Sequence, residues 1–176
     1  MLRITGSGSP LKLVLGFMLT TAVLSMWISN TATILMMLPM AIAIINAVDN
    51  PRFGVALILG IAYSASLGGV GTPIGTPPNI IFMSVYEETL GIEYSFIDWM
   101  KTGVPIVILG VPIMALWLAR GIKEVGNINL PVPGTWTKAE KRVLAIFGTV
   151  ALAWIFRPFW TAWIGVSTIS DSTIAV

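Results

Sequence analysis

Two long stretches of this chain contain no charged side chain, and they limit the fold more than any other feature. The first lies between Lys12 and Asp49, and the second lies between Arg52 and Glu87. Charged residues make up only 10% of the 176 residues, whereas a soluble domain carries about 25%. Such segments belong in a bilayer, where the backbone must satisfy its own hydrogen bonds. We therefore expect an all-α polytopic (multi-pass) protein of the cell membrane.

The charged residues lie in two connections of opposite sign. The acidic connection holds Glu87, Glu88, Glu93 and Asp98, and the basic one holds Arg120, Lys123, Lys138, Lys141 and Arg142. Cytoplasmic loops of membrane proteins carry an excess of Lys and Arg. We therefore place the basic connection in the cytoplasm and the acidic connection on the other side of the membrane.

The first apolar region, residues 10–46, is interrupted by the polar sequence Ser29-Asn30-Thr31-Ala32-Thr33. A helix needs about 20 residues to cross the hydrocarbon core; the first part of this region is marginal and the second is too short. We therefore predict a re-entrant hairpin that enters from the cytoplasm, turns within the membrane and returns. Residues 1–9 would form a cytoplasmic lead-in. Two ordinary spans joined by a tight surface turn are the alternative.

The second apolar region, residues 54–90, is interrupted at residues 68–79. The interruption holds four glycines and three prolines, so a continuous helix is excluded there. Irregular backbone is tolerated at membrane depth only where it is buried in protein or lines a wet cavity. The region is therefore predicted to be one broken transmembrane helix, with an ordinary surface turn as the alternative.

The remaining segments predict ordinary elements. Residues 102–120 are expected to form a transmembrane helix, residues 121–137 a cytoplasmic loop, and residues 138–156 a further transmembrane helix. The latter helix begins with a capping-box pattern, Thr137-Lys138-Ala139-Glu140. Residues 157–176 are expected to be an outer loop and the start of a truncated helix.

Both interruptions are polar but uncharged, and each is followed by the start of a helix. A helix N-terminus carries free N–H groups and about half a positive charge, so it attracts anions. Ser29, Asn30 and Thr31 occupy this position in the hairpin, and Pro77 to Asn79 occupy it in the broken helix. Carbonyl groups that end the preceding half-helix can hold a cation. A purely structural role, as helix caps or as hydrogen bonds between helices, is the alternative.

Composition excludes several kinds of function. Cysteine and histidine are absent, and no carboxylate pair lies in the uncharged stretches, so we expect no catalytic residues and no enzyme. No cofactor is expected, and sodium is the only metal ion considered. A net charge of +2 is too small to indicate nucleic-acid binding. The predicted breaks lack Lys, Arg and His, which favours bound cations, helix ends and other parts of the protein as compensation for an anion.

Both motifs resemble those of the divalent anion:sodium symporter family. Residues 25–33 read SMWISNTAT and are followed by Met37-Leu38-Pro39, and residues 68–79 read GGVGTPIGTPPN. The two occur in the order and at about the spacing of the family. The resemblance implies an all-helical fold of two inverted repeats, an elevator-like transport domain and a homodimer in the lipid bilayer. This chain resembles the N-terminal repeat alone.

The resemblance also implies site residues. The first sodium site would be formed by Ser25, Ser29, Asn30 and Gly75, and the substrate carboxylate would contact Asn30 and Thr31. Pro77 and Asn79 would shape the second break and line the substrate site.

The resemblance implies secondary transport of small divalent anions such as succinate, malate and fumarate, coupled to sodium. A sodium-independent exchanger and a sulfate or citrate carrier are the alternatives within transport. A membrane interaction protein that transports nothing is the alternative from another class. We expect no transport by this 176-residue chain alone.

Overall fold

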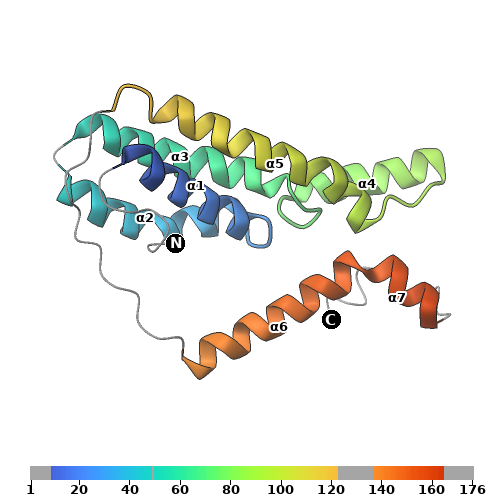
Figure 1. Cartoon of the computed structure of the whole chain (residues 1–176). Coiled ribbons are helices and arrows are strands. Elements are labelled where there is room, and N and C mark those ends of the chain that lie inside the picture. Colours follow the sequence, from blue (N-terminus) through green and yellow to red (C-terminus); the bar gives the residue numbers. More distant parts are fainter. Residues whose placement is uncertain (1–8, 49, 123–136, 165–176) are drawn as a thin grey trace.

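The computed structural model describes residues 9–48, 50–122 and 137–164, and all regular secondary structure in these residues is helical (Figure 1). The elements are α1 (Pro10–Ser25), α2 (Asn30–Ala47), α3 (Pro51–Gly69), α4 (Pro77–Leu90), α5 (Phe96–Leu118), α6 (Lys138–Ile155) and α7 (Arg157–Ile164). The expectation of an all-α membrane protein is confirmed. By length and composition, α2, α3 and α5 are able to cross a membrane.

Polar side chains fix where several helices begin. Ser29 caps α2 by accepting a hydrogen bond from the Ala32 amide, and Asn50 caps α3 by accepting one from the Phe53 amide. The predicted capping box is present at α6: the Thr137 amide donates to Glu140 Oε2 at 2.7 Å, and the Glu140 amide donates to Thr137 Oγ1 at 3.2 Å. These bonds satisfy N–H groups that have no partner inside the helix.

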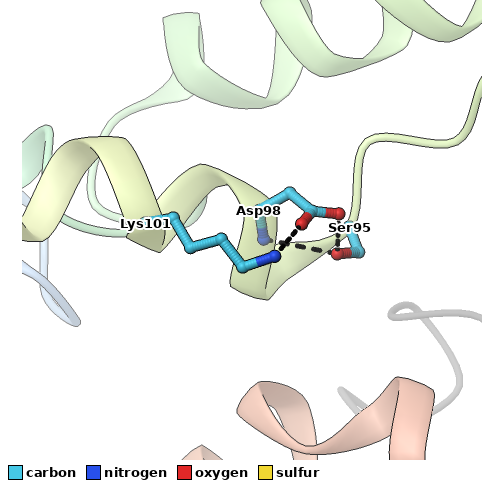
Figure 2. A network of polar contacts seen from close by, with 3 residues as sticks. All are labelled: Ser95, Asp98 and Lys101. Atoms are coloured by element: carbon cyan, nitrogen blue, oxygen red, sulfur yellow. Dashed lines mark hydrogen bonds and ion pairs between the residues drawn. The ribbon is translucent and has the colours of Figure 1, made fainter.

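Ser95 starts α5 earlier than the sequence analysis placed it. Its hydroxyl accepts from the Asp98 amide and donates to Asp98 Oδ2 at 2.5 Å, and Asp98 Oδ1 pairs with Lys101 Nζ at 2.6 Å (Figure 2). The helix therefore begins at Phe96 and not at residue 102. The acidic connection is thus partly the first turn of a helix.

Two other boundaries differ from the expectation. The Asn50 cap and Pro51 at the first helical position start α3 at Pro51, so α3 has 19 residues. Helix α2 has 18 residues and is long and apolar enough to cross a membrane, so the expectation that this part of residues 10–46 is too short is wrong. Residues 157–164 form the short helix α7 where a loop was expected. The predicted segments 1–9, 121–137 and 165–176 lie wholly or mostly outside the described residues.

Helix α3 is the centre of a bundle with α1, α2 and α5 (Figure 1). The largest side chains buried in the bundle include Phe53, Met18, Met37, Leu57 and Ile61. Gly68 lets α3 approach the backbone of α1 closely, because a Cβ at this position would lie 2.6 Å from the Cα of Ala22. Small residues at helix contacts are typical of membrane bundles, where packing and not water exclusion holds helices together.

The outer surfaces of these helices are apolar. Large exposed side chains include Leu35, Val55, Ile81, Ile108, Leu109 and Ile113. Apolar patches of this extent are unusual on soluble proteins. In a membrane protein they face lipid or neighbouring helices, so the surface agrees with a multi-pass location.

Candidate functional site

The hairpin tip and the broken helix meet at Ser25, the last residue of α1. Its buried hydroxyl lies 2.7 Å from the carbonyl oxygen of Ala65 on α3 and 2.5 Å from Oδ1 of Asn30, the first residue of α2. One hydroxyl proton is therefore placed between two oxygen acceptors from different helices. This arrangement joins α1, α2 and α3 at a single polar point inside the bundle.

The side-chain amide of Asn30 packs directly against Gly69. A Cβ at Gly69 would lie 2.7 Å from Asn30 Oδ1 and 2.6 Å from Cγ2 of Thr76. Gly75 also packs against Gly69, since a Cβ at Gly75 would lie 2.8 Å from the Cα of Gly69. The chain folds this way because residues without a side chain let the break return onto the end of α3.

The structure thus brings together three of the four residues predicted to bind sodium. Ser25 and Asn30 share a hydrogen bond, and both Asn30 and Gly75 contact Gly69. Ser29, the fourth, is exposed, and its hydroxyl accepts the Ala32 amide hydrogen bond at 3.3 Å as the α2 cap. Its side chain is therefore committed to the helix start, as the structural alternative expected.

The side chain of Asn79 holds the break between α3 and α4 in shape through three hydrogen bonds. Its Nδ2 donates to the carbonyl oxygens of Gly69 at 2.7 Å and Thr72 at 2.8 Å, and its Oδ1 accepts from Thr76 Oγ1 at 3.0 Å. The residue is only 6% exposed. Both amide hydrogens are thus used inside the protein, so Asn79 shapes the break and is not open to solutes.

Thr31 and Pro77 have the opposite character. Both are exposed and lie in the first turns of α2 and α4, where free N–H groups and the positive ends of the helix dipoles are found. These two positions are open to a solute, whereas Asn79 and Gly75 are buried.

Sequence reasoning missed two side chains that hold the break. Thr72 is fully buried and its hydroxyl donates to the Met26 carbonyl at the hairpin tip. Trp99 on α5 donates from Nε1 to the Val70 carbonyl at 2.7 Å. Gly103 lets α5 come close enough for this contact, since its Cβ would lie 3.1 Å from the Gly71 carbonyl oxygen. Nothing near Trp99 in the sequence indicated its partner, which lies 29 residues away.

Aromatic rings flank the hairpin tip. Trp27 stacks on Phe96 of α5 with ring centroids 6.4 Å apart, and Phe147 of α6 meets it edge-on at 5.2 Å. Trp27 is therefore a packing residue. A pocket of about 260 Å³ lies beside Val70, between the break and α5 residues such as Trp99 and Gly103. Its lining is mainly apolar and includes Phe82, Tyr94 and Ile106.

The chemistry of the polar cluster is uniform. It consists of hydroxyl, amide and backbone carbonyl groups from Ser25, Asn30, Ala65, Gly69 and Thr72. Oxygen atoms of this kind suit a small alkali cation, because unwound carbonyls and half-helix ends coordinate sodium in transporters. The neighbouring helix N-termini suit an anion. The cluster thus combines oxygen atoms that suit a small cation with helix N-termini that suit an anion, inside a helical membrane bundle.

Comparison with known proteins defines the family. The family described as "Citrate transporter" matches residues 1–176. The chain belongs to this family. The match covers both motifs and confirms the resemblance to the divalent anion:sodium symporters. The relatives are transporters, so the chain is grouped with carriers and not with enzymes.

The relatives with similar sequences are transporters of the kind that the resemblance implies. The sodium-dependent dicarboxylate transporter SdcS of Staphylococcus aureus strain USA300 is 36% identical over 188 aligned positions, which cover 94% of this chain and 36% of SdcS. The same transporter from strain NCTC 8325 / PS 47 gives the same identity and coverage. The chain therefore spans about a third of the length of these relatives.

We expect Asn79→Ala to lower the thermal unfolding midpoint of the purified protein with or without sodium. The substitution removes three hydrogen bonds from the break, a loss of about 2–4 kcal/mol in unfolding free energy. Asn46→Ala, at an exposed position near the end of α2, is the matched control and should leave the midpoint unchanged. An unaltered midpoint in Asn79→Ala would show that Asn79 is not a brace.

Proposed function

We propose that this chain forms one binding half of a sodium-coupled transporter of small dicarboxylates. The observation that carries the proposal is the meeting of the hairpin tip with the helix break: Ser25 bonds to Asn30, and both Asn30 and Gly75 pack against Gly69. The similar protein SdcS is a sodium-dependent dicarboxylate transporter, which favours sodium and a dicarboxylate as the two solutes.

Sodium would bind at the oxygen cluster as a transported ion. Ser25 and Asn30 would supply side-chain oxygens, and the backbone near Gly75 and Ser29 would supply carbonyl oxygens. The Ser25 proton lies between Asn30 Oδ1 and the Ala65 carbonyl, so it can turn fully to Ala65. That rotation would free Asn30 Oδ1 for the cation. No other cofactor is needed for this step.

A substrate carboxylate would bind at the exposed helix starts. Thr31 and the Asn30 amide would donate to it, and Pro77 would line its other side with Asn79 holding the break in shape. A dicarboxylate carries about two negative charges, which are costly to bury without compensation. A sodium ion beside Asn30 supplies part of that compensation, and this couples the two solutes.

The arrangement of the complete transporter is part of the proposal. Helices α1 and α2 would form a re-entrant hairpin in the lipid bilayer, α3 and α4 one broken crossing, and the whole would be half of an inverted-repeat elevator in a homodimer. Citrate is a second candidate substrate, because the matching family is described as a citrate transporter.

A cysteine at Thr31 tests the proposed position of the substrate. The chain contains no cysteine, so one introduced thiol reports on one position. In the complete transporter, we expect Thr31→Cys to react with a membrane-impermeant reagent from the cytoplasmic side. Sodium and succinate together should slow that reaction about tenfold or more, since the carboxylate would cover the residue.

Thr89→Cys is the matched control, because Thr89 is exposed at the far end of α4 near the acidic connection. It should react from the outside at a rate indifferent to succinate. Labelling of Thr31→Cys only from outside in every condition would count against the hairpin, and labelling that substrate never slows would count against the carboxylate site.

A further inference from the structure

Thr33 holds a buried hydroxyl that the protein does not use. The residue is 0% exposed, and among the described residues its Oγ1 is a buried side-chain oxygen without a hydrogen-bond partner. The other buried hydroxyls are all bound: Thr21 donates to Phe17 O at 2.7 Å, Ser64 donates to Ile61 O at 3.2 Å, and Ser25 and Thr72 have the partners given above. Burying an unpaired hydroxyl is costly, so its presence needs a reason.

The position of Thr33 points to that reason. Thr33 heads the buried stripe of α2, which continues through Met37, Ala41 and Ile44 toward the bundle core. It lies three residues after Asn30, so the two side chains are about 60° apart around the helix and about 4.5 Å apart along it. Thr31, by contrast, is exposed. The unpaired oxygen is therefore one helical turn below the Ser25–Asn30 cluster, on the protein side of α2.

An ordinary helix partner does not explain the hydroxyl. Helical threonines commonly donate to the carbonyl four residues earlier, as Thr21 does to Phe17. In Thr33 that carbonyl belongs to Ser29 and accepts the Thr33 amide at 3.0 Å, and the hydroxyl makes no bond to it. Among the residues that the structure describes, none pairs with this hydroxyl, so its lone pairs are open to a bound ion or solute.

We propose that the Thr33 hydroxyl is a further oxygen of the sodium site formed at Ser25, Asn30 and Gly75. The inference rests on the proposed function, since it assigns one more oxygen ligand to the same sodium ion. A hydroxyl oxygen suits this role, because it carries two lone pairs and can complete a set of ligands that the carbonyls of a broken helix begin. Sodium would then contact both the tip of the hairpin and the buried face of α2.

Isosteric variants of the complete transporter test the assignment. Thr33→Val removes the oxygen with little change of shape, and Thr33→Ser restores it. We expect Thr33→Val to raise the sodium concentration for half-maximal succinate uptake about tenfold or more, and Thr33→Ser to stay near the parent. Sodium should also raise the thermal unfolding midpoint of the parent and of Thr33→Ser, but less in Thr33→Val.

Thr21→Val is the matched control, since it removes a buried hydroxyl that already has a partner. It should leave the sodium dependence unchanged. Unchanged sodium dependence in Thr33→Val, or an equal drop in its midpoint with and without sodium, would overturn the proposal and leave Thr33 as a core or water-binding residue. If too little Thr33→Val inserts into the membrane for uptake to be measured, the rise of its thermal unfolding midpoint on adding sodium is the deciding measurement. A parent protein without sodium-dependent uptake would instead sink the proposed function itself.

Discussion

Asn30→Ala should abolish sodium-driven uptake at ordinary sodium concentrations in the complete transporter. The residue supplies Oδ1 to the Ser25 hydroxyl at 2.5 Å, rests on Gly69 and begins α2, so it belongs to both proposed sites. Losing a hydrogen-bonding group at one site costs about 1–3 kcal/mol, which corresponds to about five- to 150-fold in affinity. Because sodium and the substrate would each lose a contact with Asn30, the combined loss of affinity should lie at the upper end of this range.

The measurement is the sodium concentration for half-maximal uptake, followed by the succinate concentration for half-maximal uptake at saturating sodium. Asn50→Ala is the control, because Asn50 caps α3 outside the cluster. It should lower stability by about 1 kcal/mol and leave both concentrations unchanged. If Asn30→Ala leaves the half-maximal concentrations of sodium and succinate at their parental values, Asn30 serves only in the helix start or in packing.

Gly75→Ala should have a comparable effect for a different reason. The added methyl group would lie 2.8 Å from the Cα of Gly69, which is backbone and cannot rotate away. The break would have to shift away from the end of α3, and overpacking of this kind costs about 1–3 kcal/mol or more. We expect loss of uptake together with a weaker rise of the unfolding midpoint on adding sodium.

Gly148→Ala is the matched control for this substitution. Gly148 lies within α6, and an added Cβ there meets no atom within 4 Å. Alanine is the better helix former, so this variant should be neutral or slightly more stable. Wild-type uptake by Gly75→Ala would contradict the close packing of the break on Gly69.

Local patterns in the sequence predicted much of the fold. The charge-free stretches predicted the helical membrane segments, and the Gly/Pro-rich residues 68–79 predicted the break between α3 and α4. The capping box at Thr137 and Glu140 was also readable, because its two side chains act on their own helix turn. Such features depend only on neighbours along the chain.

Contacts between distant segments could not be read in the same way. The Ala65 carbonyl meets Ser25 across 40 residues, and Trp99 meets Val70 across 29 residues. A backbone carbonyl has no sequence signature, and a tryptophan shows no preferred partner. Capping by Ser29 and shaping of the break by Asn79 were among the sequence expectations, but the backbone partners of these side chains depend on where the chain turns. The motifs located the site, and only the packing of α3 and α5 showed how it is held.

The most direct test of the central claim is radiolabelled succinate uptake into proteoliposomes that contain the complete transporter. Uptake is measured with sodium outside and then with choline in its place, for the parent and for Asn30→Ala. The account predicts uptake that requires sodium and is lost in Asn30→Ala. Uptake that proceeds equally well in choline would contradict it, because the oxygen cluster at Ser25, Asn30 and Gly75 would then not be the site of a coupling ion.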